Sequence, residues 1–576
     1  MKRQCAFESA FCFLLLFFIV SSANTLKAED PAPPSSSAAH SAHAHIWFVR
    51  QDGGDRSQCT GTVDAAYPGK GKNRPCAFKH LYYLFTNDVY GNKAWVVAGG
   101  DTVLLRGGPY RMGYKGPNPK DWWGSCPGDA LNCSMPPIPS GTPDHPTRFL
   151  GENYGNCTKK TQLFGGFALN GIINLQGSSN VDVECIELTD HSQCLRGGMG
   201  DTPAEKCSND TPISDYAANG ILTDNKTTGI LLKNLDIHGL TSRGILGPIG
   251  GAVTADHVRI AFNGMAGWDF DDGSGTRSAS SASVRASYLT VEWNGCFEEY
   301  PITHALPAYR CYDQESGGYG DGIGTPNTPL NFTCDHCTFR YNTQDGFDLL
   351  HATGSAITIK NSDSYGNMGQ QWKMGPMHSV LFQNNVTVNN CRRMSAPING
   401  APEGYNKHLS LFCRAAGDGI FFSVTDGGSY VLQNNSFAGY GATSYDIGCD
   451  GHCTKANITY QNNLNIGYKD PVGGKLPAIF YESDLPRNPF VAEDHNIYYN
   501  MRSCPFGWTE HCVNPKIENM PSWNGEASLD GIDFRLTSGS PARGAGVAVP
   551  GLNEDHNGVK RPAGAQLDIG AFQYHP

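Results

Sequence analysis

Apolar and polar residues alternate with a period of two in a series of short segments through the middle of the chain. Each segment holds two such apolar runs, joined by a polar corner that often carries asparagine. The segments begin at residues 181, 230, 252, 282, 331, 356, 379, 430 and 457. Because a period of two belongs to strands and not to helices, the pattern predicts a pair of short β-strands in every segment.

From residue 230 onward the segments start 22 to 51 residues apart, so the chain repeats one structural unit with insertions of different length. A unit of two or three short strands cannot bury its apolar face alone, whereas stacking the units about 4.8 Å apart buries it. The sequence therefore predicts an all-β fold, a right-handed parallel β-helix with long inserted loops. The triplet "QNN" at 383, 433 and 461 predicts an asparagine ladder at one corner, in which each side chain satisfies its neighbour's backbone.

Outside the repeats, the two ends of the chain have their own patterns. Residues 1–23 carry Lys2 and Arg3, an apolar stretch and small residues, which predicts a signal peptide. Residues 24–44 are rich in Pro, Ser and Ala and predict a flexible linker before a single domain at 45–576. Residues 45–115 resemble the opening of exported β-helix proteins, with a first strand, a short capping helix and a first coil. Residues 525–576 resemble the closing segment of such proteins.

Composition narrows the possible partners. Sixty-nine glycines and 11% aromatic residues suit a turn-rich β protein, and the net charge of -11 argues against nucleic acid or an anionic membrane as partner. No stretch beyond the signal is long and apolar enough to span a membrane. We expect a secreted monomer.

The cysteines indicate disulfides. Two of the 20, Cys5 and Cys12, lie in the signal peptide, and the other 18 are an even number in an exported chain. Cys334 and Cys337 form a CxxC, but a zinc site needs a second pair at ligand spacing, and Cys449 and Cys453 are over a hundred residues away.

Counting along the repeats brings charged residues together. Asp348 lies seventeen positions after the start of its segment (331 to 348), and Lys373 lies seventeen after the start of the next (356 to 373). Asp269 has the same offset from residue 252, and Asp321 precedes Asp345 by twenty-four residues, about one coil. We therefore expect Asp321, Asp345 and Asp348 on one face with Lys373 at its edge.

Stacked carboxylates repel one another unless a cation lies among them, and Ca²⁺ prefers oxygen ligands from flexible sources. A bound Ca²⁺ also attracts the carboxylate of a uronic acid and acidifies its C5 proton. A lysine beside the cation is disfavoured in its charged form, so we expect the pKa of Lys373 to fall. Such a lysine is a candidate general base for β-elimination in an acidic polysaccharide.

The motifs "DGI", "QDGFD" and "WKMG" at 321, 344 and 372 resemble those of the family-9 polysaccharide lyases, the calcium-dependent pectate lyase type. This resemblance implies that Asp321, Asp345 and Asp348 hold Ca²⁺ and that Lys373 is the catalytic base. Gln344 stands where the family has a further aspartate, so it can offer one neutral oxygen only. Trp372 beside the base, and the Arg392–Arg393 pair on the following coil, are expected to contact the substrate.

Two other functions fit part of the sequence. A β-helix glycoside hydrolase of the polygalacturonase type needs spaced carboxylates, but the Gly-His-Gly and Arg-Ile-Lys motifs typical of those enzymes are absent. A non-catalytic glycan-binding or surface β-helix protein explains the repeats and cysteines equally well, but it does not predict that Lys373 shares the face of the aspartates.

Overall fold

The computed structural model describes the chain from Ala44 onward, with gaps. The described residues are 44–85, 95–113, 133–192, 194, 214–270, 282–296, 298, 300, 311, 320–394, 413–450, 453–455, 457–482, 490–504, 511–522, 528–562, 564 and 566–576. They belong to one compact unit, Ala44–Pro576. The predicted signal peptide and all of the predicted linker except Ala44 lie outside these residues.

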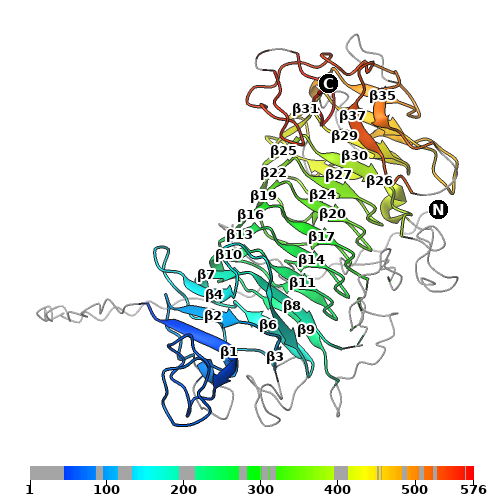
Figure 1. The fold of residues 1–576 in the computed structure, drawn as a ribbon. Coiled ribbons are helices and arrows are strands. Elements are labelled where there is room, and N and C mark those ends of the chain that lie inside the picture. The colour runs from blue at the N-terminus through cyan, green and yellow to red at the C-terminus, as the bar shows by residue number, and fades with distance from the viewer. Residues whose placement is uncertain are drawn as a thin grey trace, which may run out of the picture. The chain divides into compact units, whose positions relative to one another are not determined.

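The fold is a right-handed parallel β-helix, as predicted, and its strands stack in chain order along three faces (Figure 1). The first face is a 13-stranded sheet whose neighbours in the ladder are one coil apart in sequence. In order, its strands are β1 (Ile46–Gly54), β2 (Thr102–Arg106), β4 (Thr147–Gly151), β7 (Ser179–Glu184), β10 (Thr228–Lys233), β13 (Ala252–Asp256), β16 (Ser283–Ser287), β19 (Asn331–Asp335), β22 (Ala356–Lys360), β25 (Ser379–Gln383), β28 (Ser429–Gln433), β31 (Asn457–Gln461) and β34 (Phe490–Asp494).

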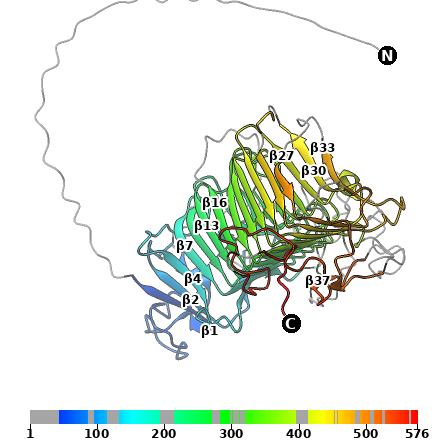
Figure 2. The same ribbon diagram turned by 90° about the horizontal axis from the view of Figure 1, so that it is seen from above.

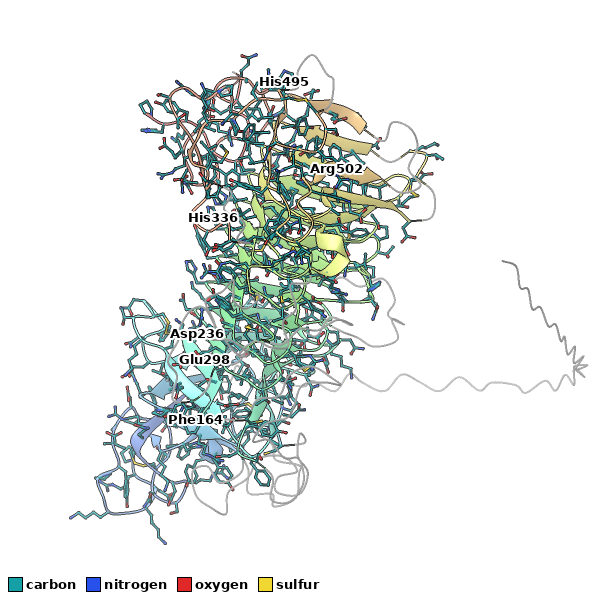
Figure 3. All side chains as sticks on the ribbon, turned by 90° about the vertical axis from the view of Figure 1, so that its right-hand side faces the viewer. Phe164, Asp236, Glu298, His336, His495 and Arg502 are labelled. Carbon is teal, nitrogen blue, oxygen red and sulfur yellow. A yellow bond between two sulfur atoms is a disulfide. The ribbon has the colours of Figure 1, made fainter. Side chains whose placement is uncertain are left out.

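The second face is a 12-stranded sheet built in the same way. Its strands are β3 (Tyr110–Met112), β5 (Thr161–Gly165), β8 (Ile186–Asp190), β11 (Asp236–His238), β14 (Arg259–Ala261), β17 (Thr290–Glu292), β20 (Thr338–Arg340), β23 (Asp363–Tyr365), β26 (Val386–Asn389), β29 (Ser436–Gly439), β32 (Leu464–Gly467) and β35 (Ile497–Tyr499). Its outer side carries a line of ion pairs, in which Arg259 joins Asp236 to Glu292 and Arg340 extends the line. Figure 3 shows Phe164, Asp236 and Glu298 on the coils of the N-terminal half, away from His495 and Arg502.

The third face is divided into two five-stranded sheets. The first contains β6 (Leu169–Asn174), β9 (Ala217–Leu222), β12 (Arg243–Leu246), β15 (Trp268–Asp269) and β18 (Ile323–Gly324), and the second contains β21 (Asp348–Leu349), β24 (Trp372–Met374), β27 (Ile420–Val424), β30 (Thr443–Cys449) and β33 (Ala478–Glu482). A single parallel bridge, Ile323 to Phe347, links the two sheets within the described residues. Figure 2 shows β27, β30 and β33 on a different side of the coils from β7, β13 and β16.

Alternating burial explains why these segments form strands. In β22 every second residue is buried, and the apolar side chains of all three faces join one interior cluster. Between the first and second faces the chain turns through one residue of positive φ in each coil, for example Asn384, Asn434 and Asn462 at 54° to 58°. Asparagine tolerates this left-handed conformation better than most residues, so the middle residue of "QNN" makes the corner.

The asparagine ladder predicted from "QNN" is confirmed, and glutamine contributes a second ladder. Asn385 accepts a hydrogen bond from the backbone N–H of Ser362 at 3.0 Å, and Asn435 accepts one from Asn385 at 2.9 Å. Gln383 donates to Gln433, which donates to Gln461. Each residue of the triplet thus has a separate structural role.

The ends of the domain differ in part from the expectation. Where a capping helix was expected, the described residues contain one turn of 3-10 helix, η1 (Leu81–Leu84), whose first turn is capped by the side chain of His80. The C-terminal segment contributes β37 (Asp533–Leu536), antiparallel to β36 (Ile517–Asn519), and then packs against the asparagine corner. There Asn434 donates to the carbonyl of Asp568 at 2.9 Å.

The disulfides predicted from the cysteine count are present, and the CxxC is one of them. The described pairs are Cys59–Cys76, Cys157–Cys185, Cys296–Cys311, Cys334–Cys337, Cys391–Cys413, Cys449–Cys453 and Cys504–Cys512. Disulfides of this number are typical of an oxidising compartment. Among the described residues, no helix has the length and apolarity to cross a bilayer.

Candidate active site

Three aspartates meet at the break in the third face. Asp321 lies just before β18, Asp345 just before β21, and Asp348 begins β21. Ligand oxygens of the three carboxylates lie within 4.8 Å of one another, and each residue is at most 1% exposed. The sequence prediction that these side chains share a face is confirmed.

Lys373 lies in the next coil and contacts two of the aspartates. In the strand ladder, Lys373 of β24 pairs with Asp348 of β21, which is the register predicted from the seventeen-residue offset. The Nζ atom lies 2.6 Å from Oδ2 of Asp348 and 3.0 Å from Oδ2 of Asp345. Asp269 lies in the same row of residues across the third face, in the other five-stranded sheet, where its strand partner is Gly324. Its side chain forms an ion pair with Arg243 and does not join the aspartate cluster.

Arg414, which was not among the predicted site residues, completes the cluster. It begins the short 3-10 helix η2 (Arg414–Gly417), and its Nη1 atom lies 3.0 Å from Oδ2 of Asp345. The same atom is 3.4 Å from Oε1 of Gln344, the residue expected to replace an aspartate ligand. The cluster of Asp321, Asp345, Asp348, Lys373 and Arg414 therefore holds three carboxylates and two cations.

A further buried amide ladder, separate from the two ladders of the "QNN" corner, fixes the position along the stack of the segments that carry the cluster. It runs from Asn263 through Asn294, Asn342 and Asn367 to Gln371, with side-chain hydrogen bonds of 2.8 to 3.0 Å between successive members. Asn342 stands two residues before Gln344, and Gln371 two residues before Lys373. Asn263, Asn294, Asn342 and Asn367 join successive coils, and Gln371 is joined to Asn367 within one coil. The coil repeat therefore places the carboxylates and the lysine.

Replacing Asn342 with leucine is expected to destabilise the protein strongly. Asn342 is fully buried and accepts hydrogen bonds from the backbone and side chain of Asn294 while donating to Val291 and Asn367. Unsatisfied buried groups cost about 1–3 kcal/mol each, so we expect a loss of roughly 3 kcal/mol or more. Thermal unfolding measures it, with Asn457→Ala on the exposed edge of β31 as control. Equal melting temperatures for the two variants would show that the ladder adds little.

Burial and like charge raise the pKa of two of the aspartates. The pKa of Asp321 lies well above its ordinary value because the side chain is buried and because Asp345 and Asp348 are negative neighbours. Burial also raises the pKa of Asp348, although the Lys373 ammonium opposes this.

For Lys373, burial lowers the pKa but the three carboxylates raise it more, so the net direction is upward. The predicted fall was for a lysine beside a bound cation, and it stays a prediction for that state. With these side chains alone the pKa moves in the opposite direction, because the carboxylates favour the charged form of Lys373.

One carboxylate oxygen of the cluster, Oδ2 of Asp321, is especially suited to bind a metal ion. Oδ2 of Asp321 is buried and has no hydrogen-bond partner among the described residues, whereas the backbone N–H of Asp345 donates to its Oδ1 at 2.8 Å. A Cβ at Gly324 would lie 3.0 Å from this Oδ2, so glycine leaves space beside it. Carboxylate oxygens are the ligands that Ca²⁺ prefers, and the three aspartates could hold a metal ion. Lys373 and Arg414 contact Oδ2 of Asp345, and Lys373 also contacts Oδ2 of Asp348.

The predicted substrate contact through Trp372 is wrong. Its side chain is fully buried in the interior, where Nε1 donates to Oγ1 of Thr387 and the ring packs against Phe339 and Phe382. Side chains alternate along a strand, so Lys373 outside requires Trp372 inside. The aromatic residue that pairs with Lys373 in the neighbouring strand is Phe421, which is partly exposed on β27.

Arg392 and Arg393 are also placed differently from the expectation. Arg392 pairs with Asp470 at 3.3 Å and Arg393 with Asp530 at 2.7 Å, and their side chains are 12% and 15% exposed. Neither contacts the aspartate cluster. Both guanidinium groups are engaged by carboxylates of the protein, which argues against the predicted role in binding substrate carboxylates.

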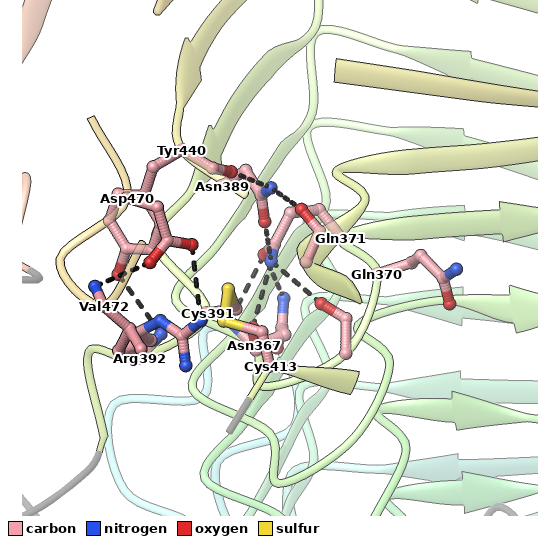
Figure 4. The surroundings of a disulfide bond; sticks show 12 residues. Asn367, Gln370, Gln371, Asn389, Cys391, Arg392, Cys413, Tyr440, Asp470 and Val472 are labelled. Carbon is pink, nitrogen blue, oxygen red and sulfur yellow. Dashed lines mark hydrogen bonds and ion pairs between the residues drawn. A yellow bond between two sulfur atoms is a disulfide. The ribbon is translucent and has the colours of Figure 1, made fainter. Parts of the chain in front are cut away.

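The turn that carries these arginines is nevertheless linked to the cluster. The Cys391–Cys413 disulfide joins it to the residue before Arg414. Figure 4 shows this disulfide with Arg392 and Asp470 on one side and the amides of Asn367, Gln371 and Asn389 on the other. The backbone N–H of Arg414 donates to the carbonyl of Met368 at 3.0 Å, so Arg414 is fixed at both the disulfide and the backbone.

Comparisons with known proteins found similarity to solved structures and no match to a family profile or curated protein. No protein-family profile matches the sequence, and no curated protein matches it significantly. Among solved structures it is similar to the pectate lyase Pel9A, with 13% identity over 92% of this chain and 96% of that one and a TM-score of 0.41. It is similar to a rhamnogalacturonan lyase, with 11% identity over 86% and 97% and a TM-score of 0.35. It is also similar to the GH136 lacto-N-biosidase from Eubacterium ramulus, with 12% identity over 81% and 68% and a TM-score of 0.26.

Proposed function

We propose that the protein is a secreted polysaccharide lyase that cleaves a uronic acid polymer such as pectate by β-elimination. The observation that carries this proposal is the position of Lys373, whose Nζ is held by Asp345 and Asp348 at the break in the third face. A lysine held in one place by buried carboxylates is preorganised to act on a single substrate proton.

In the proposed reaction, the proton on C5 of the uronate moves to Nζ of Lys373 after the lysine has released the proton that it carries in the ion pairs. The electrons of the C5–H bond form a double bond between C4 and C5. The bond from C4 to the glycosidic oxygen breaks, and that oxygen takes a proton from solvent, which balances the proton that Lys373 released to solvent beforehand. No water is consumed, and an unsaturated uronide remains.

Asp321, Asp345 and Asp348, with the neutral oxygen of Gln344, are the residues proposed to hold Ca²⁺. When bound, the ion would withdraw electron density from the substrate carboxylate and so acidify the C5 proton. The aspartates orient Nζ by direct contact, and the amide ladder behind them keeps the three coils in register.

A non-catalytic glycan-binding protein is a second candidate, and one observation favours it. Five of the six carboxylate oxygens of the cluster already accept hydrogen bonds from protein groups, including the two cations. A closed network of this kind also occurs where charges only stabilise a fold.

The first experiment is the ultraviolet absorbance of the unsaturated product, recorded with polygalacturonate and a panel of other uronic acid polymers, in calcium and in chelator. Calcium-dependent absorbance supports the lyase. New reducing ends without absorbance would identify a glycoside hydrolase, and binding without either signal would identify the glycan-binding protein.

A further inference from the structure

The charge of the cluster poses a problem for an acidic substrate. With all three carboxylates ionised against Lys373 and Arg414, the cluster carries one net negative charge at the place where a uronate would dock. Like charges repel most strongly where water is excluded, so the substrate needs a cationic group that still has free donors.

Among the described residues near the cluster, Arg414 is the more exposed cation and has more free donors than Lys373. Its side chain is 27% exposed, compared with 11% for Lys373, which lies between two aspartates. Only Nη1 of Arg414 is engaged, with Asp345 and Gln344, and its Nε and Nη2 have no hydrogen-bond partner in the described part of the chain. Arg392 and Arg393 are already paired with Asp470 and Asp530.

The guanidinium group is also held rigidly. The disulfide Cys391–Cys413, the hydrogen bond to Met368 and the ion pair with Asp345 each restrain Arg414. A planar guanidinium with one edge anchored and the other open suits a carboxylate, which accepts two parallel hydrogen bonds. Preorganisation reduces the entropy lost when the ligand binds.

The location of Arg414 fits the chemistry of the site. Nη1 of Arg414 and Nζ of Lys373 both contact Oδ2 of Asp345 at 3.0 Å, so the two cations are immediate neighbours. In a uronate the carboxylate carbon is bonded to C5. A carboxylate held beside Lys373 therefore brings the C5 proton near the proposed base.

We propose that Arg414 binds the free carboxylate of the uronate whose C5 proton is removed, and that it thereby selects the acid over its methyl ester. This proposal rests on the proposed function for the identity of the substrate. Gln344, which contacts the same Nη1 through Oε1, orients the guanidinium where an aspartate would compete with the substrate for it.

Equilibrium binding tests the proposal without requiring turnover. Isothermal titration with digalacturonate and with its dimethyl ester, in chelator, compares the unmodified protein with Arg414→Ala and Arg414→Lys. Arg535→Ala serves as the control. Arg535 is 64% exposed on β37, and its ion pair is with Asp533, so it makes no contact with the cluster residues. Asp345 keeps Lys373 and the backbone of Gln370 as partners in the Arg414 variants, so they are expected to fold.

We expect Arg414→Ala to weaken digalacturonate binding by about tenfold or more, the equivalent of about 1.4 kcal/mol. Arg414→Lys should fall between the two, since lysine keeps the charge but loses the planar fork. Binding of the ester should change by less than about twofold, on the scale of scatter for surface changes. Equal losses for acid and ester, no loss for either, or an unmodified protein that does not prefer the acid would each overturn the proposal.

The absorbance assay separates this proposal from the proposed function. Acid-selective binding that depends on Arg414, with no unsaturated product from any polymer, would refute the lyase and retain Arg414 as the carboxylate site. Product formation with an unchanged affinity in Arg414→Ala would retain the lyase and refute this role of Arg414.

Discussion

Lys373→Arg will fold with its ion pairs in place and yet lose product formation by about 10³-fold, within the range that general acid–base catalysis contributes. Arginine keeps the positive charge that Asp345 and Asp348 contact at 3.0 and 2.6 Å. It cannot be deprotonated in proteins, so it cannot accept the C5 proton. The rate of ultraviolet absorbance increase on polygalacturonate measures the effect, and thermal unfolding shows whether the variant is folded.

Lys373→Ala separates the chemical role from the structural one. Removing the ammonium leaves Asp348 without its cation and leaves Arg414 as the one cation that contacts Asp345 among the described residues. Breaking a buried ion pair typically costs about 3–5 kcal/mol. We therefore expect the alanine variant to be both inactive and less stable, whereas the arginine variant is inactive only. An arginine variant that retains activity would assign the base to another residue.

The β-helix could be predicted from the sequence because its pattern is local and repeated. A period of two in each segment indicates which side chains face the interior. The spacing between segments indicates that the segments are coils of one stack. The triplet at 383–385 shows how far this extends, since its three residues form the glutamine ladder, the positive-φ corner and the asparagine ladder.

The register of the site was predictable for the same reason. Counting from the start of each segment placed Asp348 beside Lys373, and the two strands pair at those residues. The same counting should have placed Trp372 inside, because neighbours on a strand point to opposite sides. Its assignment to the substrate came from adjacency in sequence, which is not adjacency in space.

Arg414 could not be found by counting. It follows Cys413 after the long insertion between the segments that begin at 379 and 430. Its position depends on the disulfide to Cys391, whose pairing the sequence leaves open. The upward shift of the Lys373 pKa in the absence of a cation could not be predicted either, since it depends on the distances to the carboxylates.

Asp321→Asn is expected to lose both metal binding and activity while gaining stability at neutral pH. The unpartnered Oδ2 of Asp321 is buried beside Asp345 and Asp348, so its negative charge destabilises the folded protein in the absence of a cation. Asparagine keeps an oxygen that can accept the backbone N–H of Asp345. Removing a strained functional charge commonly gains on the order of 1 kcal/mol.

The pH dependence of that gain follows from the pKa of Asp321, which burial and the two neighbouring carboxylates raise in the folded protein. The folded state holds this proton more tightly than the unfolded chain, where the pKa is about 3.9. As pH rises from there through the folded pKa, the unmodified protein loses stability that the variant does not lose. In chelator, the difference in melting temperature should therefore be small near pH 4 and grow toward neutral pH.

Calcium titration should reverse the order, because an ion that binds only the folded state stabilises the unmodified protein and not the variant. Asp269→Asn is the matched control, since Asp269 occupies the same row of the third face but pairs with Arg243. This control should gain no stability in chelator and should keep its response to calcium. If Asp321→Asn were less stable than the unmodified protein in chelator, or if calcium stabilised both equally, Asp321 would belong to a structural ion-pair network and the metal site would have to be sought elsewhere.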